Sequence, residues 1–215
     1  DFDEIEHPIS LQIGGDEPSL LAEAALIAET WGYDEINLNI GCPSPRVQAG
    51  NFGACLMAEP DKVAKCVEAM TQATKIPITV KHRIGIDNLD SFSFLKDFVD
   101  KIDSAGAKRF SIHARKALLN GLSPLENRTI PPLKYEMVAE LKKQRPNLII
   151  ELNGGLKTPE DCLKALEIFD GAMVGRAAYK HPLLWKQMDA LIYKDKEISD
   201  ICASKIIKNL IPFAE

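Results

Sequence analysis

The cysteines and histidines are the residues whose spacing most directly limits the possible chemistry. The four histidines never stand at H-x-x-x-H spacing, and the cysteines form no C-x-x-C pair and no dense framework. We therefore predict no metal site and no structural disulfides, so at least one thiol is free to react. The five cysteines are Cys42, Cys55, Cys66, Cys162 and Cys202.

Glycines follow two late segments that have strand character. Asn153-Gly154-Gly155 ends one segment, and Gly175-Arg176 ends the next. Glycine lets the backbone approach an anion closely, and backbone N–H groups at the N-terminus of a following helix bind phosphate oxygens. For either motif alone, a simple turn of the chain is the better explanation. Together, at the last two strands, they predict a phosphate-binding site between them.

Two basic side chains end other segments of strand character. Lys81 follows the apolar run 78–80, where it could contact a cofactor or a substrate carbonyl. The alternative is a surface lysine whose stem lies along apolar surface. We favour the site because the neighbours of Lys81 in the strand are apolar. His113 also ends a strand, and by itself it fits a hydrogen-bonded core histidine as well as a site residue.

The elements that must position these residues are short β-type runs that alternate with amphipathic segments. The predicted strands are 11–15, 35–41, 78–85, 109–113, 148–154 and 171–175. The predicted helices are 19–30 (capped by Ser19), 60–73, 90–104, 135–143 and 158–168. The segment 42–51 is predicted to be a loop because glycine and proline interrupt it.

Strands that alternate with helices form parallel sheets. We expect the strands to be apolar nearly throughout, because both faces of such a sheet are covered. Each strand ends in polar residues or glycine, and the carboxyl ends of parallel strands are where such proteins carry their chemistry. A doubly wound sheet is the alternative, but no G-x-G-x-x-G turn follows an early strand.

The pattern therefore predicts a (β/α)8 TIM barrel with six of its eight strands present, the first two being missing from this chain. Residues 1–181 form the partial barrel in this interpretation. Residues 182–215 have only helical pattern and are predicted to begin a C-terminal helical domain.

Composition and charge restrict the class of protein further. No apolar run approaches the length that spans a bilayer, and no signal peptide opens the chain, so we expect a cytoplasmic protein that does not bind membranes. The formal net charge of −5 counts against a nucleic-acid partner. Basic clusters at 81–83, 113–116 and 142–145 can nevertheless produce a local positive patch.

A series of motifs along nearly the whole chain resembles the tRNA-dihydrouridine synthases. Each motif alone is weak, but their order and intervals together are specific. The loop 113–132 and the run 52–57 are most similar to the A-type bacterial subgroup. The motifs are LQIGG at 11–15, NLNIGCPS at 37–44, VQAGNFGACLM at 47–57, VKHRIG at 80–85, IHARK at 112–116, GLSPLENR at 121–128, NGG at 153–155 and VGR at 174–176.

The resemblance implies an FMN enzyme that reduces the C5–C6 double bond of uridine in the D-loop of tRNA, with NADPH or NADH as the reductant. It implies substrate contacts for Asn39 and Arg128, and it makes Cys42 the acid that protonates C5 while the reduced flavin delivers a hydride to C6. A proton donor must stand on the opposite face of the base from the flavin, and a thiol is largely protonated at neutral pH. The FMN contacts implied are Gln12, Lys81, His113, Asn153, Gly154, Gly155, Gly175 and Arg176.

Alternatives exist for the proton donor and for the function. Cys55 competes with Cys42, but it enters an apolar segment where a small buried cysteine is common. The first alternative function is an FMN barrel that acts on free pyrimidines, similar to dihydroorotate dehydrogenase. The second is a barrel fragment that binds tRNA without catalysis. We expect a monomer.

Overall fold

The computed structural model describes residues 2–194 and 202–211, and in this part of the chain six strands alternate with helices. The strands are β1 (Ser10–Ile13), β2 (Glu35–Ile40), β3 (Ile78–Arg83), β4 (Arg109–His113), β5 (Ile149–Asn153) and β6 (Gly171–Met173). The α-helices between them are α1 (Pro18–Thr30), α2 (Pro45–Ala49), α3 (Pro60–Ala73), α4 (Phe92–Ser104), α5 (Tyr135–Gln144) and α6 (Pro159–Leu166). Short 3-10 helices are η1 (Glu4–Glu6), η2 (Gly53–Ala58) and η3 (Glu126–Arg128).

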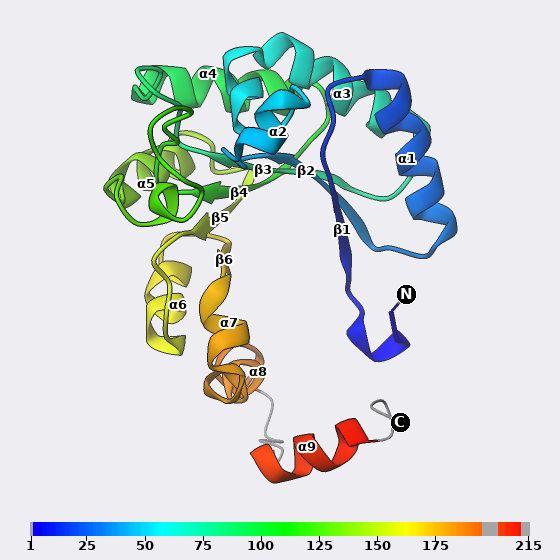
Figure 1. Cartoon of the computed structure of the whole chain (residues 1–215), viewed down its shortest axis with the longest axis vertical. Helices are drawn as coiled ribbons and strands as arrows, with labels where there is room; N and C mark the ends of the chain where they lie inside the picture. The colour runs from blue at the N-terminus through cyan, green and yellow to red at the C-terminus, as the bar shows by residue number, and fades with distance from the viewer. Residues whose placement is uncertain (1, 195–201, 212–215) are drawn as a thin grey trace.

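All six strands lie in one parallel sheet, in the order in which they occur along the chain. The strands follow an arc with β1 and β6 at its two ends, and α1, α3, α4 and α5 cover the outer side (Figure 1). Sequential order with a helix after each strand is the arrangement of an α/β barrel. The predicted fold class, an α/β barrel with six parallel strands in the described part of the chain, is therefore confirmed.

The two faces of the sheet differ in character, and here the prediction of strands that are apolar throughout is wrong. The outer face, against the helices, carries fully buried residues such as Leu38, Val80 and Ile112. The inner face carries polar side chains that form hydrogen bonds between neighbouring strands. These bonds join Gln12 to Asn37, Asn37 to Thr79, Ser10 to Glu35 and Ser111 to Glu151. Since successive side chains alternate across a strand, polar residues at every second position all face the barrel interior.

Several predicted boundaries are corrected by the caps that the structure shows. Helix α1 begins at Pro18, so Ser19 lies inside the first turn and does not cap the helix. Proline suits this first position because its ring fixes φ at a helical value and it lacks an N–H. The predicted loop 42–51 contains α2, which Ser44 caps by accepting a bond from the Val47 N–H. By contrast, Thr158 caps α6 at its predicted start, and Asp161 completes a capping box there.

The described residues that follow β6 are helical or irregular and include no strand. They form α7 (Arg176–Lys180), η4 (Pro182–Trp185), α8 (Met188–Tyr193) and α9 (Ala203–Leu210). The division into two domains at residue 182 stays a prediction, and 195–201 and 212–215 lie outside the described residues. In the described ranges, no helix combines the length and the apolar character that a membrane span requires.

Candidate active site

A cavity of about 740 Å³ lies at the carboxyl ends of the strands. Strand-end residues such as Asn39 of β2, Lys81 of β3, His113 of β4 and Asn153 of β5 line it, together with the loops that follow. The structure thus brings every residue predicted for the site into one space. Those residues are Gln12, Asn39, Cys42, Lys81, His113, Arg128, Asn153, Gly154, Gly155, Gly175 and Arg176.

Among the residues that the structure describes, those of the cavity wall carry positive charge and include no carboxylate. Its cationic residues are Lys81, Arg83, Arg128, Lys157, Arg176 and Lys180, and no Asp or Glu is among the residues that line it. Sequence reasoning did not single out Arg83, Lys157 or Lys180 as site residues. Arg83 was detectable, because it stands two residues after Lys81 in one strand and so shares its face. Two residues of the basic cluster 113–116, Arg115 and Lys116, do not line the cavity.

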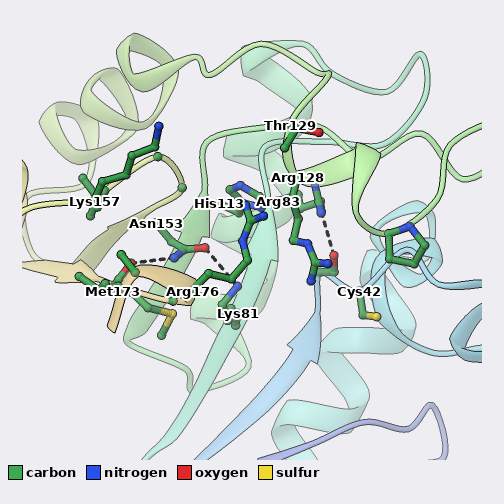
Figure 2. A pocket seen from close by; sticks show the side chains of 18 of the residues that line it. Cys42, Lys81, Arg83, His113, Arg128, Thr129, Asn153, Lys157, Met173 and Arg176 are labelled. Carbon is green, nitrogen blue, oxygen red and sulfur yellow. Dashed lines mark hydrogen bonds between the residues drawn. The ribbon is translucent and has the colours of Figure 1, made fainter. Parts of the chain in front are cut away.

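Lys81 and His113 project toward the same space from neighbouring strands (Figure 2). Burial, reinforced by the nearby Arg83, lowers the pKa of Lys81 to about 8. Its ammonium donates one bond, at 3.4 Å, to Asn153 Oδ1, and Asn153 Nδ2 in turn donates to Met173 O at 2.7 Å. Burial together with Arg83 and Lys81 lowers the pKa of His113 to about 2, so this ring is a neutral imidazole at physiological pH.

The Gly154-Gly155 turn is packed so closely that neither residue can carry a side chain. Gly154 has φ +103°, and a Cβ there would stand 2.4 Å from His113 Cδ2. Gly155 has φ +79°, and its Cβ would stand 2.6 Å from the Tyr135 hydroxyl, which donates to Gly154 O. Positive φ is a conformation that L side chains rarely adopt. The backbone of this turn lines the cavity, and His113 and Tyr135 pack against it.

The turn that carries Cys42 is fixed by two neighbouring polar residues. Asn39 Oδ1 accepts bonds from the Gly41 and Cys42 N–H groups at 3.0 and 3.1 Å. Arg83 Nε donates to Gly41 O at 2.8 Å. The Cys42 thiol itself lies 3.6 Å from Ser44 Oγ, to which it can donate.

The buried guanidinium of Arg83 also ties this turn to the loop between β4 and α5. Its Nη1 donates to the carbonyl oxygens of Lys116 and Asn127 at 3.1 and 2.9 Å. All of these acceptors are neutral, so the charge of Arg83 is not cancelled by a carboxylate. Burial lowers the pKa of Arg83 to about 10, which leaves it cationic at neutral pH.

Cys55, the alternative proton donor, is held away from this cavity. It lies in η2, its thiol donates to Phe52 O at 3.2 Å, and it is not among the cavity-lining residues. Burial raises the pKa of its thiol. Cys66 and Cys162 are buried, whereas Cys202 is exposed and immediately precedes α9.

These features fit a ligand that carries phosphate and carbonyl oxygens, such as FMN. A cluster of cations without a carboxylate attracts an anion, and a buried ammonium and amide N–H groups donate to carbonyls. The exposed backbone at Gly154 and Gly155 offers close approach to a phosphate. In the residues that the structure describes, no group of three or more His, Cys, Asp or Glu side chains could hold a metal ion.

The sheet, its helices and the cationic cavity define an α/β-barrel protein with a cavity that is suited to an anionic ligand, at the carboxyl ends of its strands. Residues 1–209 match the family model described as "Dihydrouridine synthase (Dus)". The chain belongs to this family, which confirms the resemblance. It is similar to tRNA-dihydrouridine(20/20a) synthases of Synechocystis (56% identity) and Pasteurella multocida (51%), with the match covering 100% of this chain in each case. Relatives of this kind fit the bacterial subgroup that was predicted.

The chain spans 64% and 65% of the length of these two relatives. Among solved structures, a mandelate oxidase variant with benzoyl-formic acid matches at a TM-score of 0.50 and 17% identity. The match covers 84% of this chain and 51% of the mandelate oxidase chain. At this level of identity the likeness concerns the fold alone.

Proposed function

We propose that the protein is a tRNA-dihydrouridine synthase that reduces the C5–C6 double bond of a D-loop uridine. The observation that carries the proposal is the cationic cavity, with the Cys42 turn and the Gly154-Gly155 turn both in its wall. Family membership and the names of the relatives support it. They also favour tRNA over a free pyrimidine, which was the alternative substrate.

FMN is the proposed cofactor, and NADPH or NADH the proposed reductant. Gln12, Lys81 and His113 would hold the ring system, and the turns at 153–155 and 175–176 would hold the phosphate, with Arg176 as the forked donor. When bound, FMN supplies the hydride. Lys81, as a cation, stabilises negative charge on a carbonyl oxygen of the ligand.

The chain's own groups complete the reaction on the uracil. Asn39 and Arg128 are proposed to bind the base, and Cys42 to donate the proton to C5 from the face opposite to the cofactor. The thiol loses its proton in this step and must regain one from solvent before the next turnover. A cavity that receives a base from tRNA must be open to the solvent. The exposed side chains of Lys157 and Lys180 line this cavity.

The proposal also includes a monomer in the cytoplasm, with the segment from 182 onward beginning a helical domain that binds tRNA. The test uses the purified full-length protein, an unmodified tRNA transcript and NADPH. Flavin absorbance in the protein, together with dihydrouridine in the tRNA by nucleoside mass spectrometry, is the expected result. Flavin-dependent reduction of free uracil or uridine, with the tRNA left unchanged, would replace this function by the alternative.

A further inference from the structure

A continuous series of hydrogen bonds follows the inner face of the sheet, away from the Cys42 turn. It begins where Asn39 Oδ1 accepts the backbone N–H groups of Gly41 and Cys42. Asn39 Nδ2 then donates to Gln12 Oε1 at 3.0 Å. Both of these amide side chains, Asn39 and Gln12, line the cavity.

The series continues into the interior of the barrel. Gln12 Nε2 donates to Asn37 Oδ1 at 2.7 Å, Asn37 Nδ2 donates to Thr79 Oγ1 at 2.8 Å, and the Thr79 hydroxyl donates to Glu35 Oε1 at 2.7 Å. Glu35 Oε2 accepts from Arg109 Nη1, also at 2.7 Å. Asn37 and Thr79 are only 5% and 3% exposed, and neither lines the cavity. We call Asn39, Gln12, Asn37, Thr79 and Glu35 the hydrogen-bond chain.

The two ends of the hydrogen-bond chain determine its direction. A backbone N–H can only donate, and a carboxylate that pairs with an arginine can only accept. Each amide between them must therefore accept on its oxygen and donate from its nitrogen. Turning one amide over would set two donors or two acceptors against each other, which is costly where water is excluded. Bonds aligned in one direction also polarise and strengthen one another.

This direction decides which atoms face the ligand. In the described part of the chain, each NH₂ group of Asn39 and Gln12 makes a single bond within the protein, so each retains one N–H. Together with Lys81 and Arg83, these N–H groups give the nearby cavity wall a surface of donors. Carbonyl oxygens match such a surface, whereas an amino group in the same place would meet donors only.

We infer that Thr79 and Glu35 are positioning residues for this site. By fixing the direction of the Gln12 and Asn39 amides, they hold the Cys42 turn and present N–H donors to the carbonyl oxygens of a ligand. Neither residue touches the cavity. The inference rests on the proposed function for the identity of the ligand, but not for the hold on the Cys42 turn.

The test is Thr79→Val, which keeps the shape of the side chain and removes the hydroxyl, with Thr79→Ser as the conservative control. In full-length protein without flavin, alkylation of Cys42 by iodoacetamide is followed by mass spectrometry. We expect it to be several-fold faster in Thr79→Val and restored to the parent rate in Thr79→Ser. Alkylation of Cys55, which has its own bond to Phe52 O, should be the same in all three proteins.

A second readout uses the loaded protein and separates positioning from general damage. Single-turnover oxidation of the reduced flavin by tRNA should fall about tenfold in Thr79→Val, because a displaced general acid loses rate even when it is present. Reduction of the flavin by NADPH should slow less than oxidation does, because the Cys42 turn takes no part in it, and Thr79→Ser should restore both rates. A merely structural effect would lower both half-reactions and the amount of folded protein together.

Glu35→Gln tests the same inference at the other end of the hydrogen-bond chain, because a glutamine amide can donate as well as accept. This variant provides the test of the inference if Thr79→Val does not fold. Cys42 alkylation at the parent rate in the folded variants would overturn the inference, even in a protein that reduces tRNA. Conversely, altered alkylation that Thr79→Ser restores would support it even if the parent forms no dihydrouridine. The positioning role and the proposed function therefore fail separately.

Discussion

Lys81 illustrates how the cavity changes the chemistry of a single residue. Burial and the neighbouring Arg83 hold its pKa near 8, so Lys81 is mostly cationic at neutral pH but loses its charge in mildly alkaline solution. A ligand that accepts hydrogen bonds from the ammonium binds the protonated form. Binding therefore raises the pKa of Lys81, and the affinity for such a ligand must fall as the pH rises above that value.

We predict that the affinity of the flavin-free, full-length protein for FMN falls above pH about 8, by at most about tenfold per pH unit. Quenching of flavin fluorescence at a series of pH values measures it. Lys81→Arg is the matched control, because its guanidinium keeps its charge throughout this range. A profile that is flat for the parent, or equally steep for the control, would show that another group is responsible.

His113 lines the same cavity but, unlike Lys81, it carries no charge at neutral pH. Its pKa of about 2 leaves it uncharged at any pH at which the protein is used, so in this structure it can accept or donate a hydrogen bond but cannot supply a cation. Its ring also packs against Gly154, where any Cβ would collide with it. The residue therefore shapes the turn as well as lining the cavity.

At the scale of the elements, β3 joins the site to the core. Its inner positions carry Thr79, Lys81 and Arg83, and its outer position His82 is fully buried between the rings of Phe98 on α4 and Phe110 on β4. His82 Nδ1 donates to Arg83 O at 2.7 Å, and among the described residues Nε2 has no hydrogen-bond partner. Burial lowers the pKa of this ring to about 4.

The depressed pKa of His82 predicts a loss of stability in acid. Because the unfolded value is about 6.5, the unfolded chain binds the proton more readily, and the stability present above that pH is lost as the pH falls toward 4. Relative to His82→Leu, the free energy of unfolding of the parent should fall by on the order of 3 kcal/mol across this window. Urea unfolding at several pH values measures it. Parallel curves for the two proteins would contradict the prediction.

The elements also show what the sequence could and could not predict. Strand order, parallel pairing and helices α3 and α6 follow from periodicity and from start signals such as Thr158-Pro159. Helix α2 was missed because glycine and proline were taken as interruptions, although Pro45 at the first position is compatible with a helix. The polar inner face was missed because both faces of a parallel sheet were expected to be apolar. The alternation of Glu35, Asn37 and Asn39 with apolar residues in β2 was a local signal of it.

The site was predictable to the extent that each residue ends a strand. Lys81, His113 and Asn153 could be placed in this way, since the carboxyl ends of parallel strands meet at one edge. Lys157 and Lys180 could not be placed in this way, because neither ends a strand: Lys157 lies in the loop before α6, and Lys180 is the last residue of α7. The roles assigned to the individual residues stay predictions.

For the molecule as a whole, the net charge of −5 and the cationic cavity have opposite consequences for binding a polyanion. Attraction must be local, while the rest of the surface repels. Lys116 contributes little to the attraction, because Asp90 stands 3.0 Å from its ammonium. Lys157 and Lys180 are exposed at the cavity and are the cations best placed to meet a phosphate backbone.

The affinity for tRNA should therefore decrease steeply with salt, as counterions are released from the phosphates. Filter binding or fluorescence anisotropy over a range of KCl concentrations measures the slope of log affinity against log salt. Lys180→Gln should weaken the binding of tRNAs of any sequence, and it should reduce the magnitude of this slope by about 1. Lys164→Gln, a change on α6 away from the cavity lining, is the control. An affinity that does not depend on salt would contradict this account.

The central claim is that Cys42 delivers the proton in a uridine reduction, and single-turnover oxidation of the reduced flavin by tRNA tests it most directly. In the full-length protein, Cys42→Ala should slow this step by about 10²–10⁴, the usual effect of losing a general acid. Flavin content and flavin reduction by NADPH should stay near the parent values. Cys55→Ala is the matched control and should oxidise at the parent rate, with some loss of stability from a small cavity. If Cys55→Ala stalls while Cys42→Ala runs at the parent rate, the assignment of Cys42 is wrong.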